Sequence, residues 1–128
     1  MACYGDAAVR AVALVRQGDD QSPVRAWDTA VVEAFPHSKS SQEKGCPRSA
    51  FLGLCESGRV KGVPAGTYTR SKKNKEYALI AMDLLKQNPA LVSDVSLLWN
   101  MVVAGTPKAP NHQMAVVGAL WTADLLLP

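Results

Sequence analysis

The segment SPVRAWDTAVVEAFP, residues 22–36, has the clearest helix pattern in the chain. Ser22 is a favourable N-cap, and Pro23 suits the first helical position, where its missing N–H group needs no partner. Pro36 ends the segment. One helix face is apolar, with the three- and four-residue spacing of a buried stripe, at Val24, Trp27, Ala30, Val31, Ala34 and Phe35. This stretch therefore predicts an amphipathic helix that buries the Trp27 face.

Five more helices are predicted from the same kinds of signal, and no segment alternates convincingly as a strand. We expect them at about residues 6–17, 47–58, 72–87, 93–104 and 111–126. Polar loops join them, and a short β-bridge around Val60 or Tyr68 is compatible with the pattern. The sequence thus predicts an all-α fold, a compact single domain of about six helices with short loops over residues 1–128.

Length and composition favour one globular domain. A chain of 128 residues and 13.7 kDa fits a single core, and 48% hydrophobic residues with 20% charged residues argue against disorder. The N-terminus lacks a secretory-signal pattern, and the most apolar runs, 97–104 and 114–121, are shorter than the roughly 18 residues of a membrane span. Three cysteines without a CxxC pair indicate free thiols. We therefore expect a cytoplasmic protein with no membrane partner.

The charge is strongly polarised along the chain. Between residues 39 and 75 there are nine Lys and Arg residues and two acids, a net charge of +7. The remainder has five basic and nine acidic residues, a net charge of −4. We call residues 39–75 the basic segment.

Two of the predicted helices carry charges at the ends where the helix dipole disfavours them. Lys72, Lys73 and Lys75 open a predicted helix at the end where the helix dipole is already positive. The preceding helix has Lys44 and Arg48 about its start, while Glu56 lies at its C-terminal end. Cations and unpaired backbone N–H groups at helix starts favour an anion such as phosphate. We therefore predict anion binding by Lys44, Arg48, Lys61, Arg70, Lys72, Lys73 and Lys75.

The partner of this surface is left open by the sequence. Nucleic acid, or another phosphorylated or polyanionic partner, fits the charge. A helix-turn-helix motif does not fit, because the 58–71 link is much longer than the usual turn. The alternative interpretation is a solvated Lys-rich stretch that only aids solubility.

Enzymatic signals are weak. Cys46 precedes Pro47 at a helix start among basic residues, as reactive cysteines often do, and is a weak catalytic candidate. Catalysis would also need a base, and the spacing places neither His37 nor His112 near it. No metal-ligand spacing, phosphate loop or dinucleotide fingerprint occurs, so no metal site and no cofactor are predicted. A binding protein is favoured over a Cys46-dependent enzyme.

The C-terminal part, residues 90–128, is an apolar helical hairpin with only three charged side chains. VSLLWNMVV (95–103) and QMAVVGALWTADLLL (113–127) are apolar on more than one face, so each is either central or covered by another chain. This pattern predicts a homodimer, and the alternative function is therefore that of a protein-interaction module. The other interpretation is that both helices belong to the core of a monomer. The residues expected near the dimer interface are Trp99, Met101, Trp121 and Leu125.

The segment SSQEKGCPRSAFLGLCESGRVKGVPAGTYTRSKKNKEYAL, residues 40–79, resembles a family of small, functionally uncharacterised bacterial proteins. The resemblance covers about the first two-thirds of the chain and includes a tryptophan helix like that of Trp27. Similar proteins occur among mobile integron gene cassettes. The resemblance implies a compact bacterial cytoplasmic domain, and it assigns no activity or functional residue. The residues that carry it are Lys44, Cys46, Pro47, Arg48, Phe51, Gly58, Gly62, Pro64, Gly66, Tyr68 and Thr69.

Overall fold

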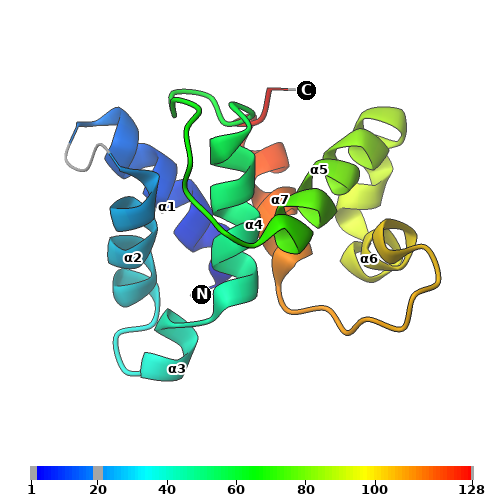
Figure 1. Cartoon of the computed structure of the whole chain (residues 1–128), viewed down its shortest axis with the longest axis horizontal. Coiled ribbons are helices and arrows are strands. Elements are labelled where there is room, and N and C mark those ends of the chain that lie inside the picture. The colour runs from blue at the N-terminus through cyan, green and yellow to red at the C-terminus, as the bar shows by residue number, and fades with distance from the viewer. Residues whose placement is uncertain (1–2, 19–21, 128) are drawn as a thin grey trace.

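The structure, a computed structural model, describes residues 3–18 and 22–127, and the part described is helical (Figure 1). Its elements are α1 (Tyr4–Arg16), α2 (Pro23–Ala34), α3 (Lys39–Gln42), α4 (Gly45–Glu56), α5 (Lys72–Gln87), the 3-10 helix η1 (Pro89–Ser93), α6 (Val95–Val103) and α7 (Gln113–Thr122). Within these residues the only β pairing is an isolated antiparallel bridge between Val60 and Leu126. The predicted all-α single domain is confirmed.

Helix α7 lies at the centre of the fold. It packs against α1, α4, α5 and α6, and Figure 1 shows it behind α4, between the α1–α2 pair and the α5–α6 pair. Val116, Val117 and Leu120 are fully buried. A helix surrounded by others must be apolar all round, which explains the uncharged sequence of α7.

Aromatic stacking joins α1, α2 and α4. Trp27 of α2 is fully buried and stacks on Phe51 of α4, with 5.2 Å between ring centroids. Tyr4 of α1 lies 6.5 Å from Trp27 on another side and 4.7 Å from Phe35. The apolar face predicted around Trp27 is therefore core, as expected.

The bounds of several helices differ from the predictions. The loop predicted after α2 contains α3, because Ser38 caps it through a bond from the Ser41 N–H group. Helix α4 begins at Gly45, two residues before Pro47. The helix predicted from residue 93 begins instead at Val95, because the carboxylate of Asp94 accepts the Leu97 N–H group and caps it.

The last helix is shorter than predicted at both ends. Its N-cap is His112, with a left-handed φ of 67°, in place of Asn111. It ends at Thr122, and Asp124 turns the chain with a φ of 58°. The residues beyond α7 then pair with the segment after α4, where Lys61 N–H donates to the Leu125 carbonyl at 2.8 Å.

Helices α4 and α5 cross at a glycine. A Cβ atom built on Gly53 would lie 2.6 Å from Cβ and 2.7 Å from Cα of Lys75. Only a residue without a side chain allows α5 to approach this closely. The crossing places the first turn of α5 against the last turn of α4.

We expect Gly53→Ala to lower the free energy of unfolding by about 1 to 3 kcal/mol, because the new methyl group would have to push the α5 backbone away. Urea denaturation measures this. The matched control is Gly45→Ala in the same helix, where no atom lies within 4 Å of the added Cβ. Its stability should be unchanged or slightly higher. Equal effects of the two substitutions would contradict a tight crossing at Gly53.

Candidate anion-binding site

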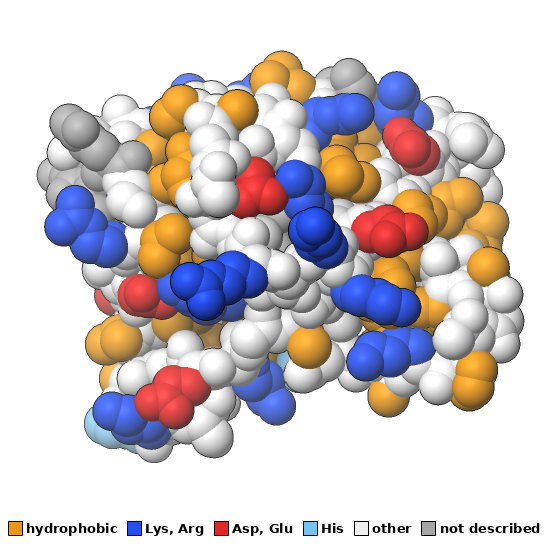
Figure 2. Space-filling model, in the orientation of Figure 1, with side chains coloured by type: hydrophobic (Ala, Val, Ile, Leu, Met, Phe, Trp, Pro, Cys, Tyr) orange, Lys and Arg blue, Asp and Glu red, His pale blue; other side chains and the backbone are white. Residues whose placement is uncertain are grey.

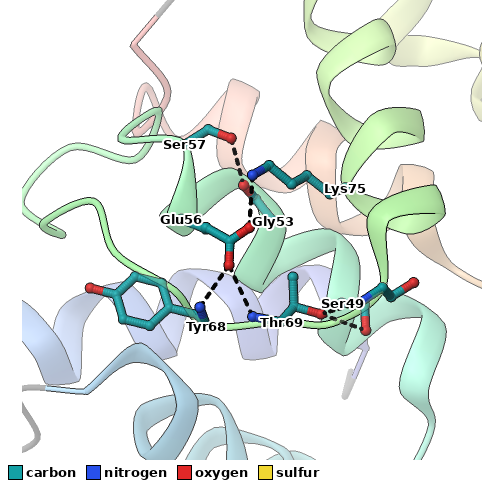
Figure 3. A network of polar contacts seen from close by, with 8 residues as sticks. Ser49, Gly53, Glu56, Ser57, Tyr68, Thr69 and Lys75 are labelled. Carbon is teal, nitrogen blue, oxygen red and sulfur yellow. Dashed lines mark hydrogen bonds and ion pairs between the residues drawn. The ribbon is translucent and has the colours of Figure 1, made fainter.

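Glu56, the last residue of α4, holds the chain that leads into α5. Its Oε1 atom accepts the N–H groups of Tyr68 at 2.7 Å and Thr69 at 3.2 Å, and Oε2 accepts from Lys75 Nζ at 2.7 Å (Figure 3). The Glu56 side chain is only 14% exposed. The bond from Lys75, followed by the two backbone bonds, lowers the pKa of Glu56 from 4.5 to about 2. Glu56 is thus an ionised anchor for the loop.

This arrangement explains why Glu56 and Lys75 occupy helix ends where the helix dipole disfavours their charges. Glu56 is unfavourable at a helix C-terminus and Lys75 is unfavourable near a helix N-terminus. Because the two ends meet at Gly53, each charge compensates the other in a partly buried ion pair. Lys75 therefore has a partner within the chain.

Two more of the seven predicted anion-binding residues also have carboxylate partners. Arg48 Nε lies 3.2 Å from Asp28 Oδ1, and Lys61 Nζ lies 3.1 Å from Asp124 Oδ1. Asp124 is almost fully exposed and Asp28 is more than half exposed, so both pairs are worth little in stability. They nevertheless reduce the positive charge that these two residues offer to a ligand.

The other four predicted residues form no ion pair in the part of the chain that the structure describes: Lys44, Arg70, Lys72 and Lys73. Lys44 is half-buried at the N-cap of α4. Arg70, Lys72 and Lys73 are exposed at the start of α5, and we call these three the cationic rim. Blue side chains spread over the middle of the face in Figure 2, with red ones among them.

A cleft of about 640 Å³ lies beside the cationic rim. Its wall is formed by the end of α4, the loop into α5 and the first two turns of α5. Arg70, Lys72 and Lys75 of the predicted set line it, whereas Lys44, Arg48, Lys61 and Lys73 do not. The other lining residues are Glu56, Gly66, Thr67, Thr69, Ser71, Glu76 and Leu79. The sequence analysis missed Glu56 as an anchor and Glu76 as a lining residue.

Hydrogen bonds fix the start of α5 on its neighbours. Ser71 caps the helix, and its Oγ accepts from Asn74 Nδ2 at 2.9 Å. Asn74 Oδ1 accepts from Nε2 of the fully buried Gln113 at 3.1 Å, which ties α5 to α7. Thr69 Oγ1 lies 3.3 Å from Ser49 Oγ, which ties the loop to α4 (Figure 3). The cationic rim therefore stands on a rigid frame.

Cysteine chemistry has no support in the geometry. Cys46 is half-buried at the second residue of α4, and no hydrogen bond among the described residues joins it to His37 or His112. Burial raises the pKa of the Cys55 thiol well above its usual range, so this thiol is inert. Over the described ranges there is no cluster of three or more His, Cys, Asp or Glu residues that could hold a metal ion.

The surface of α6 has exposed apolar side chains. Val95, Leu97 and Met101 are 45%, 46% and 43% exposed. Trp99, expected near a dimer interface, is 3% exposed, and its Nε1 donates to the Lys108 carbonyl at 2.8 Å. Trp121 and Leu125 are half-buried. In the described part of the chain no helix is long and apolar enough to cross a membrane.

The fold and the cleft define a small all-α domain with a charged cleft between two crossing helices and a loop. A family model described as "Family of unknown function (DUF6979)" matches residues 1–127, so the chain belongs to this family. The predicted resemblance to an uncharacterised family is confirmed at that level, and the match extends over nearly the whole chain. No curated protein and no solved structure matches the chain.

Glu56→Gln should lower the free energy of unfolding at pH 7 by about 1 to 3 kcal/mol, because a buried charge-assisted network loses its charge. The pKa of Glu56 is lower in the folded chain than its ordinary 4.5. Its ionisation therefore stabilises the fold above pH 4.5, and this contribution is lost as the pH falls toward 2. Urea denaturation at pH 7 and at pH 3 should show a smaller difference between wild type and variant at the lower pH.

The control for this experiment is Glu76→Gln, which removes an exposed carboxylate with no ion pair in the described residues. We expect it to change stability by less than about 0.5 kcal/mol. A Glu56→Gln effect that is the same at both pH values would show that Glu56 is not an ionised anchor.

Proposed function

We propose that the protein is a binding module for a phosphorylated or polyanionic partner, which it holds at the cationic rim and the adjoining cleft. One observation carries the proposal: Arg70, Lys72 and Lys73 are exposed and have no ion pair among the described residues, and Arg70 and Lys72 line a cleft of about 640 Å³. Lys75, also at the start of α5, is by contrast neutralised by Glu56.

Phosphate is the anion that this chemistry suits best. A guanidinium group and two ammonium groups provide several charged donors within four residues. The hydroxyl group of Thr67 lines the cleft and forms no hydrogen bond with any described residue. The frame built by Glu56, Ser71 and Gln113 fixes the backbone from which these side chains extend.

The proposal includes a bacterial, cytoplasmic setting. Cys3, Cys46 and Cys55 are all free thiols, which is typical of a reducing compartment. The sequence resemblance supports the bacterial origin.

We expect Lys72→Glu/Lys73→Glu to abolish or strongly weaken binding of short oligonucleotides, used as phosphate-bearing probes across a salt series. If the three rim residues each contact one phosphate, log K for a single strand should fall with log salt with a slope of about −2. The variant, with one positive residue left and two negative ones added, should have a slope near zero. Fluorescence anisotropy measures both.

The matched control is Lys86→Glu/Lys108→Glu, which changes the net charge equally at two exposed lysines outside the cleft. It should retain the wild-type slope. Equal loss of binding in both variants would show an unspecific charge effect, and no binding of any phosphate-bearing probe by the folded wild type would overturn the proposal.

The second candidate function is self-association through α6, which the exposed Val95, Leu97 and Met101 favour. Of the residues predicted near such an interface, Met101 is exposed, and Trp121 and Leu125 are half-buried. Buried Trp99 would support the helix from below. The two functions use different faces of the molecule and are compatible with each other.

If α6 forms the dimer contact, Leu97→Glu/Met101→Glu should shift sedimentation velocity at micromolar concentration from dimer to monomer, because two charges would be buried without partners. The control is Val32→Glu on α2, since Val32 is 51% exposed and lies outside the C-terminal hairpin. A wild-type chain that sediments as a monomer at every concentration would remove this candidate.

A further inference from the structure

We infer that the ligand of the cleft is a small phosphate monoester of a sugar or another polyol, and not the backbone of a nucleic acid. This inference rests on the proposed function and names the chemical class that the same site would recognise. It follows from the number of available cations, from an unpaired carboxylate in the cleft and from the nature of its walls.

The available cations suit one phosphate group. Arg48, Lys61 and Lys75 are paired with carboxylates, which removes three of the seven predicted contacts. The three residues of the cationic rim fall within positions 70–73, and two of them, Arg70 and Lys72, line the cleft. Proteins that bind a nucleic-acid backbone typically contact about 6 to 10 phosphates spread along a groove. A compact anion matches the rim, whereas an extended one would leave the rim after one or two phosphates.

Glu76 adds a second kind of recognition. It lines the same cleft as Arg70 and Lys72, and within the described residues it forms neither an ion pair nor a hydrogen bond. A carboxylate repels a second phosphate and accepts hydrogen bonds from hydroxyl groups. Glu56, the other acid in the cleft, already accepts three bonds. The cleft therefore offers one anionic acceptor for ligand hydroxyls beside cations for one phosphate.

The walls of the cleft offer no aromatic stacking surface. None of the described residues that line it is aromatic, and Leu79 is its one large apolar side chain. Two aromatic residues are next in sequence to lining residues, and both have partners within the chain. The Tyr68 hydroxyl donates to the Pro64 carbonyl at 2.7 Å, and the Tyr77 ring packs edge-on against Trp99 with 5.2 Å between ring centroids. Recognition of single-stranded bases relies on aromatic stacking. A polar, non-aromatic carrier fits these walls better than a nucleobase.

The size of the cleft agrees with this class. At about 640 Å³ it falls in the range of roughly 300 to 1,000 Å³ that small-molecule sites occupy. The unengaged Thr67 hydroxyl gives a further donor and acceptor for ligand hydroxyls. Phosphate on the rim and hydroxyls toward Glu76 and Thr67 would use the four side chains of the cleft that form no ion pair or hydrogen bond with the described residues: Arg70, Lys72, Glu76 and Thr67.

Isothermal titration calorimetry at pH 7.5 with four probes tests the inference: glucose 6-phosphate, inorganic phosphate, glucose and adenosine 5′-monophosphate. We expect glucose 6-phosphate to bind about tenfold more tightly than inorganic phosphate, as one charge-assisted hydrogen bond from a hydroxyl group would provide. Glucose alone should bind far more weakly than either, and adenosine 5′-monophosphate no more tightly than inorganic phosphate.

Two variants locate the effect. Glu76→Gln should remove most of the tenfold preference while leaving the affinity for inorganic phosphate unchanged or slightly higher, because a repulsive charge is lost. Asp83→Asn is the matched control, two turns further along the exposed face of α5 and outside the cleft, and it should keep the preference. Thermal unfolding of both variants checks that they fold.

The outcomes separate the inference from the proposed function. If inorganic phosphate and glucose 6-phosphate bind equally, or if the nucleotide or a single-stranded oligonucleotide binds more tightly than glucose 6-phosphate, the inference falls and the anion-binding function stands. A preference that survives Glu76→Gln also overturns it. If no phosphate-bearing probe binds to the folded protein, both fall together.

Discussion

The arrangement of the cleft depends on the three hydrogen bonds that the Glu56 carboxylate accepts. It receives two backbone N–H groups from the loop and the ammonium group of Lys75, so one side chain joins α4, the loop and α5. This junction requires the crossing at Gly53, because a side chain there would separate the two helices. The last turn of α4 and the first turn of α5 thereby become one rigid corner, and the cationic rim extends from it.

Local chemistry was enough to predict most of the helices. The bounds of α5 are those expected, because Ser71 as N-cap and Pro89 after Asn88 act on neighbouring backbone groups. Where the prediction was wrong, local caps account for α3 and for the start of α6, and distant contacts contribute elsewhere. The chain leaves α7 at Thr122 because residues after it pair with the segment around Val60. The short α3, which has no buried residue, is held by the Tyr4 hydroxyl, which donates to the Ser41 carbonyl 37 residues away.

The candidate site was predictable in its charges and not in their pairing. The unusual positions of Glu56 and of the lysines of α5 were visible in the sequence, and these residues lie where α4 and α5 cross. Their opposite charges at neighbouring helix ends could have suggested that Glu56 and Lys75 form an ion pair. The pairs Arg48–Asp28 and Lys61–Asp124 join residues 20 or more positions apart, so only the folded chain reveals them. Glu76 had no sequence signal, because a carboxylate in the second turn of a helix is ordinary.

The charges of Lys72 and Lys73 at the start of α5 are not compensated by any ion pair among the described residues. Each cation at an exposed helix start costs a few tenths of a kcal/mol, and Lys75 recovers this cost through Glu56. Lys72 and Lys73 form no compensating ion pair among the described residues. The helix start that carries them is nevertheless fixed by the hydrogen bond from the fully buried Gln113 to Asn74. Rigidity is unnecessary for charges that only aid solubility, since solvated lysines serve that role on any flexible loop. An unpaired cluster on a fixed frame beside a cleft is the arrangement that a bound anion would require, and this combination, more than the net charge of the segment, supports a binding function.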